Sequence, residues 1–174
     1  RRLGLTRHRY PEKVELVLPY LTRAGLVPDA DAARLYVTRV VEAAGPRMTD
    51  AGALLEYVCL ILADDTIDFD QAAATKSLGA AYKGAPAVPA MKDALTKLRA
   101  AIESAQPFDA LTLKTETEAL AQTEGAKAGP LSQVLRVAAT GKEVGFSAYD
   151  TLAVLGRDRC LARIGRALQG EPGA

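Results

Sequence analysis

The sequence contains no tryptophan, and only 5% of its 174 residues are aromatic. It has a single histidine, His8, and two cysteines, Cys59 and Cys160. A zinc site needs closely spaced Cys and His ligands, so these counts disfavour one. Because the cysteines lie far apart in apolar helical stretches, we expect two buried free thiols, a usage that suits a reducing cytosol.

Neither sign of charge dominates, because 22 Lys and Arg residues face 21 Asp and Glu residues and the net charge is +1. Nucleic-acid binding, which usually goes with a basic surplus, would therefore have to rest on local charge. Long apolar runs are missing too, since a membrane span needs roughly 20 consecutive residues. We expect a cytoplasmic protein without a signal peptide or a membrane partner. The start at Arg1, in place of Met, leads us to expect a piece of a longer chain.

Signatures of catalysis are absent as well. The sequence has neither a Walker-type phosphate loop nor a nucleophile elbow. Asp64, Asp65, Asp68 and Asp70 lie close together, but the glycine and the distal glutamate of a calcium loop are missing, which favours a solvated turn. The lone His8 has no neighbour that would set it up as a general base. We therefore expect no catalytic residue, no metal and no cofactor in this chain.

The apolar residues that are present recur at helical spacing, and Leu, Val, Ile and Ala supply them. This pattern predicts an all-α fold. Pro19 should kink or divide the first helix. The Gly-, Ala- and Pro-rich stretch 79–89 is the best candidate hinge, so we predict two helical subdomains, residues 1–84 and 85–174. Helices are predicted over residues 11–24, 32–44, 50–62, 71–78, 90–104, 109–124, 130–140, 147–155 and 157–168.

The C-terminal part carries a specific pattern of helix ends and arginines. Residues 130–141 read PLSQVLRVAATG, and residues 149–164 read YDTLAVLGRDRCLARI. In the order of helix end, loop, glycine stop and arginine spacing, this segment resembles the closing segment of bacterial glutamyl-tRNA synthetases. The likeness extends upstream through Pro19-Tyr20-Leu21, Arg47-Met48-Thr49 and Phe69-Asp70, and covers residues 11–168.

The resemblance implies a function without chemistry in this chain. It implies that residues 1–84 contact the stem and part of the anticodon loop of tRNA(Glu), and that residues 85–174 cradle anticodon bases. Activation of glutamate, with ATP and Mg²⁺, would belong to the catalytic domain of the parent protein, acting in cis. We expect a monomer.

Arg47 matches the family position at which an arginine reads the last anticodon base. A guanidinium group offers only donors, which suits the O2 and N3 acceptors of cytosine and opposes the N1–H and N2–H donors of guanine. Between Glu42 and Asp70 there are seven acidic residues and only this basic one. Arg47 is therefore either a salt-bridge partner or the reader of that base.

Residues 130–168 hold six cations and three acids. Arg159, Arg163 and Arg166 are three and four residues apart and share a helix face, which is either solvated or directed at phosphates. The segment Lys142–Ala148 is the loop expected to touch bases, with Phe146 placed to stack on one. Tyr149 is expected to belong to the core. The candidate RNA-binding residues are Arg47, Thr49, Arg136, Lys142, Gly145, Phe146, Ala148, Arg157, Arg159 and Arg163.

Two alternatives remain at this point. The near-neutral charge and the scarcity of aromatics also suit an all-helical module that binds another protein. The second alternative is that the chain is an ancillary appendage of some other synthetase.

Overall fold

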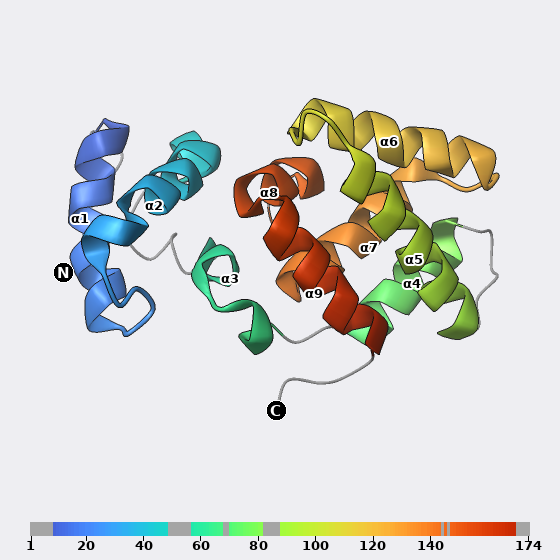
Figure 1. Ribbon diagram of the computed structural model, residues 1–174, viewed down its shortest axis with the longest axis horizontal. Coiled ribbons are helices and arrows are strands. Elements are labelled where there is room, and N and C mark those ends of the chain that lie inside the picture. Colours follow the sequence, from blue (N-terminus) through green and yellow to red (C-terminus); the bar gives the residue numbers. More distant parts are fainter. Residues whose placement is uncertain are drawn as a thin grey trace. The chain divides into compact units, whose positions relative to one another are not determined.

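The computed structural model describes residues 9–48, 57–67, 70–81, 88–143, 145 and 147–169. The chain forms two compact units, residues 1–62 and 63–174. All regular structure in the described ranges is helical (Figure 1), which confirms the predicted all-α fold. The predicted subdomain boundary between residues 84 and 85 lies outside the described residues.

The first unit is built on α1 (Tyr10–Arg23) and α2 (Ala30–Ala44), which pack against each other. Apolar side chains of both helices form its core: Val14, Val17, Leu18 and Leu21 from α1, and Val37, Val40 and Val41 from α2. Asp29 begins α2 by accepting hydrogen bonds from the backbone N–H groups of Asp31 and Ala32, at 2.9 and 3.1 Å. Of the two predicted effects of Pro19, a kink or a division, the division is wrong, because α1 continues through that residue.

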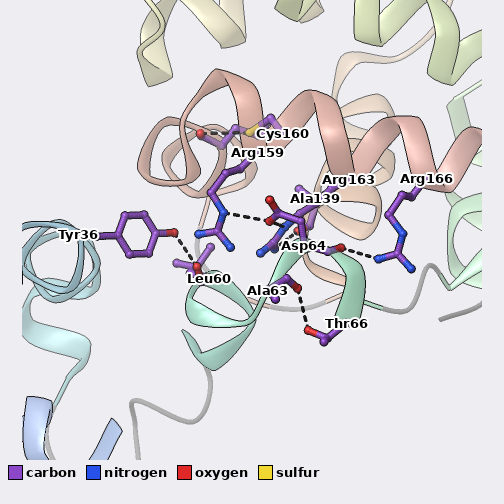
Figure 2. A network of polar contacts seen from close by, with 11 residues as sticks. Tyr36, Leu60, Ala63, Asp64, Thr66, Ala139, Arg159, Cys160, Arg163 and Arg166 are labelled. Carbon is purple, nitrogen blue, oxygen red and sulfur yellow. Dashed lines mark hydrogen bonds and ion pairs between the residues drawn. The ribbon is translucent and has the colours of Figure 1, made fainter. Parts of the chain in front are cut away.

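Two short elements follow α2 in the first unit. They are η1 (Gly45–Arg47) and α3 (Val58–Ile61). The hydroxyl of Tyr36 on α2 donates a 2.6 Å hydrogen bond to the carbonyl of Leu60, which ties α3 to α2 (Figure 2). Most of the helix predicted over residues 50–62 lies outside the described residues.

In the second unit, the other helices pack around one apolar helix, α7 (Ala128–Thr140). Its buried side chains include Leu131, Val134, Leu135 and Val137. The helices packed against it are α4 (Gln71–Ala81), α5 (Val88–Ser104), α6 (Ala110–Thr123), α8 (Ala148–Leu155) and α9 (Arg157–Gln169). A short turn, η3 (Asp64–Thr66), opens the unit and packs against α9. Because α4 packs on α7, it belongs with the helices that follow it.

None of the helices in the described part of the chain has the length and apolarity to cross a membrane. Among the same residues, His, Cys, Asp and Glu side chains form no group suited to hold a metal ion.

Both cysteines are buried free thiols, as predicted. Burial raises the pKa of the Cys160 thiol to about 12, and its Sγ donates to the carbonyl of Leu152 at 3.4 Å. The thiolate is the reactive form of cysteine, and pH 8 is close to the pKa of a thiol that is not buried. We therefore expect that neither cysteine is alkylated in the native protein near pH 8. Mass spectrometry after iodoacetamide treatment, with and without urea, measures this. Rapid native labelling of Cys160 would contradict the buried position.

Candidate nucleic-acid interface

The segment that follows α7 is held from that helix by two side chains. The amide nitrogen of Gln133 and the guanidinium of Arg136 both donate to the backbone carbonyl of Glu143, the second at 3.1 Å. They lie three residues apart on α7 and so face the same side of it. We call residues 141–147 the α7–α8 loop, of which 141–143, 145 and 147 are described.

Thr140 and Gly141 form the base of this loop. Gly141 ends α7 in the left-handed region at φ 69°, where a side chain would be strained. The Thr140 hydroxyl donates to the carbonyl of Arg136 at 2.8 Å and accepts from the backbone N–H of Lys142 at 3.1 Å. The turn out of α7 is therefore fixed by the sequence Thr-Gly, while the Lys142 side chain is exposed.

Arg136 carries donor capacity that its contacts do not use. Among the described residues its Nε is buried and has no hydrogen-bond partner. Desolvation lowers the pKa of this guanidinium, because burial disfavours its charge. Because the unused Nε is itself buried, it is not open to RNA, and contact of Arg136 with RNA stays a prediction.

The arginines of α9 behave differently from the expected phosphate-facing strip. The Nε atoms of Arg159 and Arg163 donate to the same carboxylate oxygen of Asp64, at 2.9 and 2.6 Å. Arg166 donates to the Asp64 backbone carbonyl at 2.6 Å, and Arg163 also donates to the carbonyl of Ala139 at 2.6 Å. Figure 2 shows all three side chains directed from α9 toward Asp64. We call Asp64 and these three arginines, Arg159, Arg163 and Arg166, the Asp64 cluster.

This cluster corrects two predictions. Asp64 belongs to an ion-paired cluster and is not part of a fully solvated turn. The side chain of Arg163 is only 2% exposed, so it holds helices together and does not face phosphates. Arg159 and Arg166 are partly buried, and their contact with RNA stays a prediction.

Two other predicted RNA-binding residues are engaged within the protein: Arg157 contacts the end of α5, and Ala148 is buried. The Arg157 guanidinium lies 5.3 Å from the centre of the Phe108 ring and donates to the carbonyl of Ala105, which ties the start of α9 to the end of α5. Ala148 as a whole is only 3% exposed, so little of it is open to RNA, and its contact with RNA stays a prediction. Gly145 is exposed.

Tyr149, expected in the core, is only partly buried and is not among the buried core residues. It is half-buried, and its hydroxyl is hydrogen-bonded to Ser132 of α7 and Thr117 of α6. Burial raises the pKa of the phenol. The ring thus joins α8 to two neighbouring helices.

Thr49, Phe146 and the Arg47 side chain lie outside what the structure describes. The backbone next to Arg47 is anchored by a residue that sequence reasoning missed: Lys13, 4% exposed, donates from Nζ to the carbonyl of Met48 at 3.0 Å. The only hint in the sequence was a lysine on the apolar side of the first helix.

The first unit also has a groove between α1 and α2, with a volume of about 420 Å³. Arg34, one of its lining residues, is paired with Glu15 and with Asp31. The groove contains none of the residues predicted to bind RNA. Its lining residues are Glu15, Leu18, Pro19, Thr22, Arg23, Ala30 and Arg34.

The family profile described as "Anticodon binding domain" matches residues 12–168. The chain belongs to this anticodon binding domain family. The match covers the helices of both units and the α7–α8 loop, which connects α7 to α8.

Sequence relatives of this anticodon binding domain are glutamate–tRNA ligases. That of Rhodopseudomonas palustris strain TIE-1 is 33% identical over 134 residues, which are 77% of this chain and 26% of the relative. That of Roseiflexus castenholzii is 34% identical over 158 residues, 89% of this chain and 29% of the relative. The domain thus spans less than a third of either protein. These relatives confirm the resemblance to bacterial glutamyl-tRNA synthetases.

A solved structure shares the fold. It is a crystal structure of a glutamate tRNA ligase from Elizabethkingia meningosepticum in complex with its amino acid, with a TM-score of 0.69 and 19% sequence identity. The likeness covers 92% of this anticodon binding domain and 29% of that chain. This likeness shows the fold alone, and it is the family match and the sequence relatives that count against an unrelated protein-interaction module.

Proposed function

We propose that this anticodon binding domain holds the anticodon loop of tRNA(Glu) for a glutamate–tRNA ligase and performs no chemistry of its own. The observation that carries the proposal is the family match over residues 12–168 together with relatives that are glutamate–tRNA ligases. ATP and Mg²⁺ would be used by the catalytic domain in cis. The free buried thiols suit work in a reducing cytosol, and we expect a monomer.

Unpaired anticodon bases expose their Watson–Crick edges, and a protein reads them with donors and acceptors at fixed places. The α7–α8 loop suits this task because Gln133 and Arg136 fix its path while Lys142 stays exposed. Lys142 would attract the RNA backbone and Phe146 would stack on a base. Arg47 and Thr49 would supply contacts from the first unit.

The proposal predicts salt-dependent binding of tRNA(Glu). Each phosphate that a cation neutralises releases counterions, so affinity should fall at least about tenfold between about 50 and 200 mM salt. Fluorescence anisotropy with a labelled tRNA(Glu) transcript measures this. The control is a transcript of equal length with an unrelated anticodon, which should bind more weakly at every salt concentration. Equal and salt-independent binding of both transcripts would refute the proposal.

A further inference from the structure

The Asp64 cluster joins the start of the second unit to the base of the α7–α8 loop. Asp64 lies in η3, and its carboxylate accepts a 2.6 Å hydrogen bond from Arg163 of α9. Arg163 in turn donates to the carbonyl of Ala139, the last residue but one of α7. Within two residues of that carbonyl, Gly141 ends the helix and the loop begins.

We propose that Asp64 is a positioning residue for RNA recognition, which acts through Arg163 on the end of α7 and so on the loop. This inference rests on the proposed function, because the loop is the part expected to meet anticodon bases. Nothing in it requires Asp64 to touch RNA.

The carbonyl of Ala139 is one that a helix cannot satisfy by itself. The last four carbonyls of an α-helix have no partner within the helix and carry the negative end of its dipole. A buried cation at this place satisfies the carbonyl and complements the dipole. The position of Arg163 therefore determines how the last turn of α7 is held.

Asp64 fixes the orientation of that cation. A guanidinium is planar, so a carboxylate bound at Nε fixes the direction in which the terminal nitrogens point. At 2% exposure, Arg163 also has little water to replace a lost counter-charge. Removing the charge of Asp64 should thus loosen the hydrogen bond to Ala139.

Arg159 and Arg166 hold Asp64 itself. Arg159 binds the same carboxylate oxygen and Arg166 binds the backbone carbonyl. Because these donors are directed at Asp64, the cluster fixes η3 against α9. This is why the expected effect of Asp64 is on loop position and not on the salt dependence of binding.

The test compares Asp64→Asn, which removes the charge and keeps the shape, with two controls. Asp65→Asn makes the same change at an exposed neighbour. Ile102→Val removes one methyl group from the core of α5 and controls for a general loss of stability. Arg163→Lys is a second test variant, because one ammonium group cannot reproduce the planar bridge between Asp64 and Ala139.

Two measurements are made on each variant. The first is the affinity for tRNA(Glu) at several salt concentrations. We expect Asp64→Asn and Arg163→Lys to bind about threefold to tenfold more weakly with an unchanged salt slope, while both controls bind as the wild type does. The second is amide hydrogen exchange, which should become faster over residues 138–147 and stay unchanged in α6.

Several results would overturn the inference. The first is that Asp64→Asn shows wild-type affinity and wild-type exchange. The second is that Ile102→Val loses as much affinity as Asp64→Asn. The third is that Asp64→Asn binds tRNA more tightly with a steeper salt slope, which would mean that the released arginines bind phosphates. If the wild type itself does not bind tRNA, the proposed function fails. The exchange measurement, which needs no RNA, still decides whether Asp64 holds the loop.

Discussion

Replacing Arg163 by alanine is expected to lower the free energy of unfolding by about 2–4 kcal/mol. This side chain is a buried cation with hydrogen bonds to the carboxylate of Asp64 and to the carbonyl of Ala139. Its loss leaves a carbonyl and a carboxylate in a partly desolvated place. Removal of one partner of a buried ion pair typically costs about 3–5 kcal/mol.

The effect should stay somewhat below the upper end of that range. The Asp64 side chain remains 29% exposed and keeps its hydrogen bond to Arg159. Water and the second guanidinium can therefore compensate part of the lost charge. Chemical unfolding by urea, followed by circular dichroism, measures the change.

Arg99→Ala provides the matched control. Arg99 lies on α5 and pairs with Glu103 one turn later at 3.4 Å, with side chains that are 37% and 53% exposed. An exposed pair of this kind contributes about 0–1 kcal/mol. If Arg163→Ala cost no more than Arg99→Ala, the structural role assigned to Arg163 would have to be abandoned.

Much of the fold could be predicted because local signals mark the helix ends. Asp29 and Asp109 accept backbone hydrogen bonds at the starts of α2 and α6, as capping aspartates do. Gly141 ends α7 in a conformation that glycine favours. These residues act on neighbours within four positions, so the sequence alone reveals them.

The Asp64 cluster could not be predicted because its partners are about a hundred positions apart in sequence. In the sequence, three arginines on one helix face suggested phosphates, and clustered aspartates suggested solvent. Only the packing of η3 against α9 reveals that these groups neutralise each other. Lys13 is a similar case, since its bond to Met48 joins positions 35 residues apart.

The α7–α8 loop lies between these two cases. Its length, its Thr-Gly start and the exposure of Lys142 follow from local sequence. The two donors on the carbonyl of Glu143 do not, because a side chain that reaches across ten residues leaves no local signature. The candidate site is thus found from the sequence, while the contacts that hold it come from the structure.

Arg47→Gln is expected to reduce discrimination between C and G at the last anticodon base by about 1–3 kcal/mol, or about 5- to 150-fold in relative affinity. An arginine presents donors only, so it can bond O2 and N3 of cytosine and meets the N1–H and N2–H donors of guanine unfavourably. The amide of glutamine has both a donor and an acceptor and can serve either base. The loss should therefore appear as tighter binding of the G variant as well as weaker binding of the C form.

Competition binding with two tRNA(Glu) transcripts that differ only in this base measures the ratio. Arg39→Gln, the same charge change at an exposed position of α2, controls for altered long-range attraction and should leave the ratio unchanged. Arg47→Lys keeps a cation that only donates, so it should retain the preference for C in weakened form. If the ratio of affinities for the C and G transcripts were unaltered in Arg47→Gln, Arg47 would be a salt-bridge partner of the acidic residues around it. Another residue would then have to read this base.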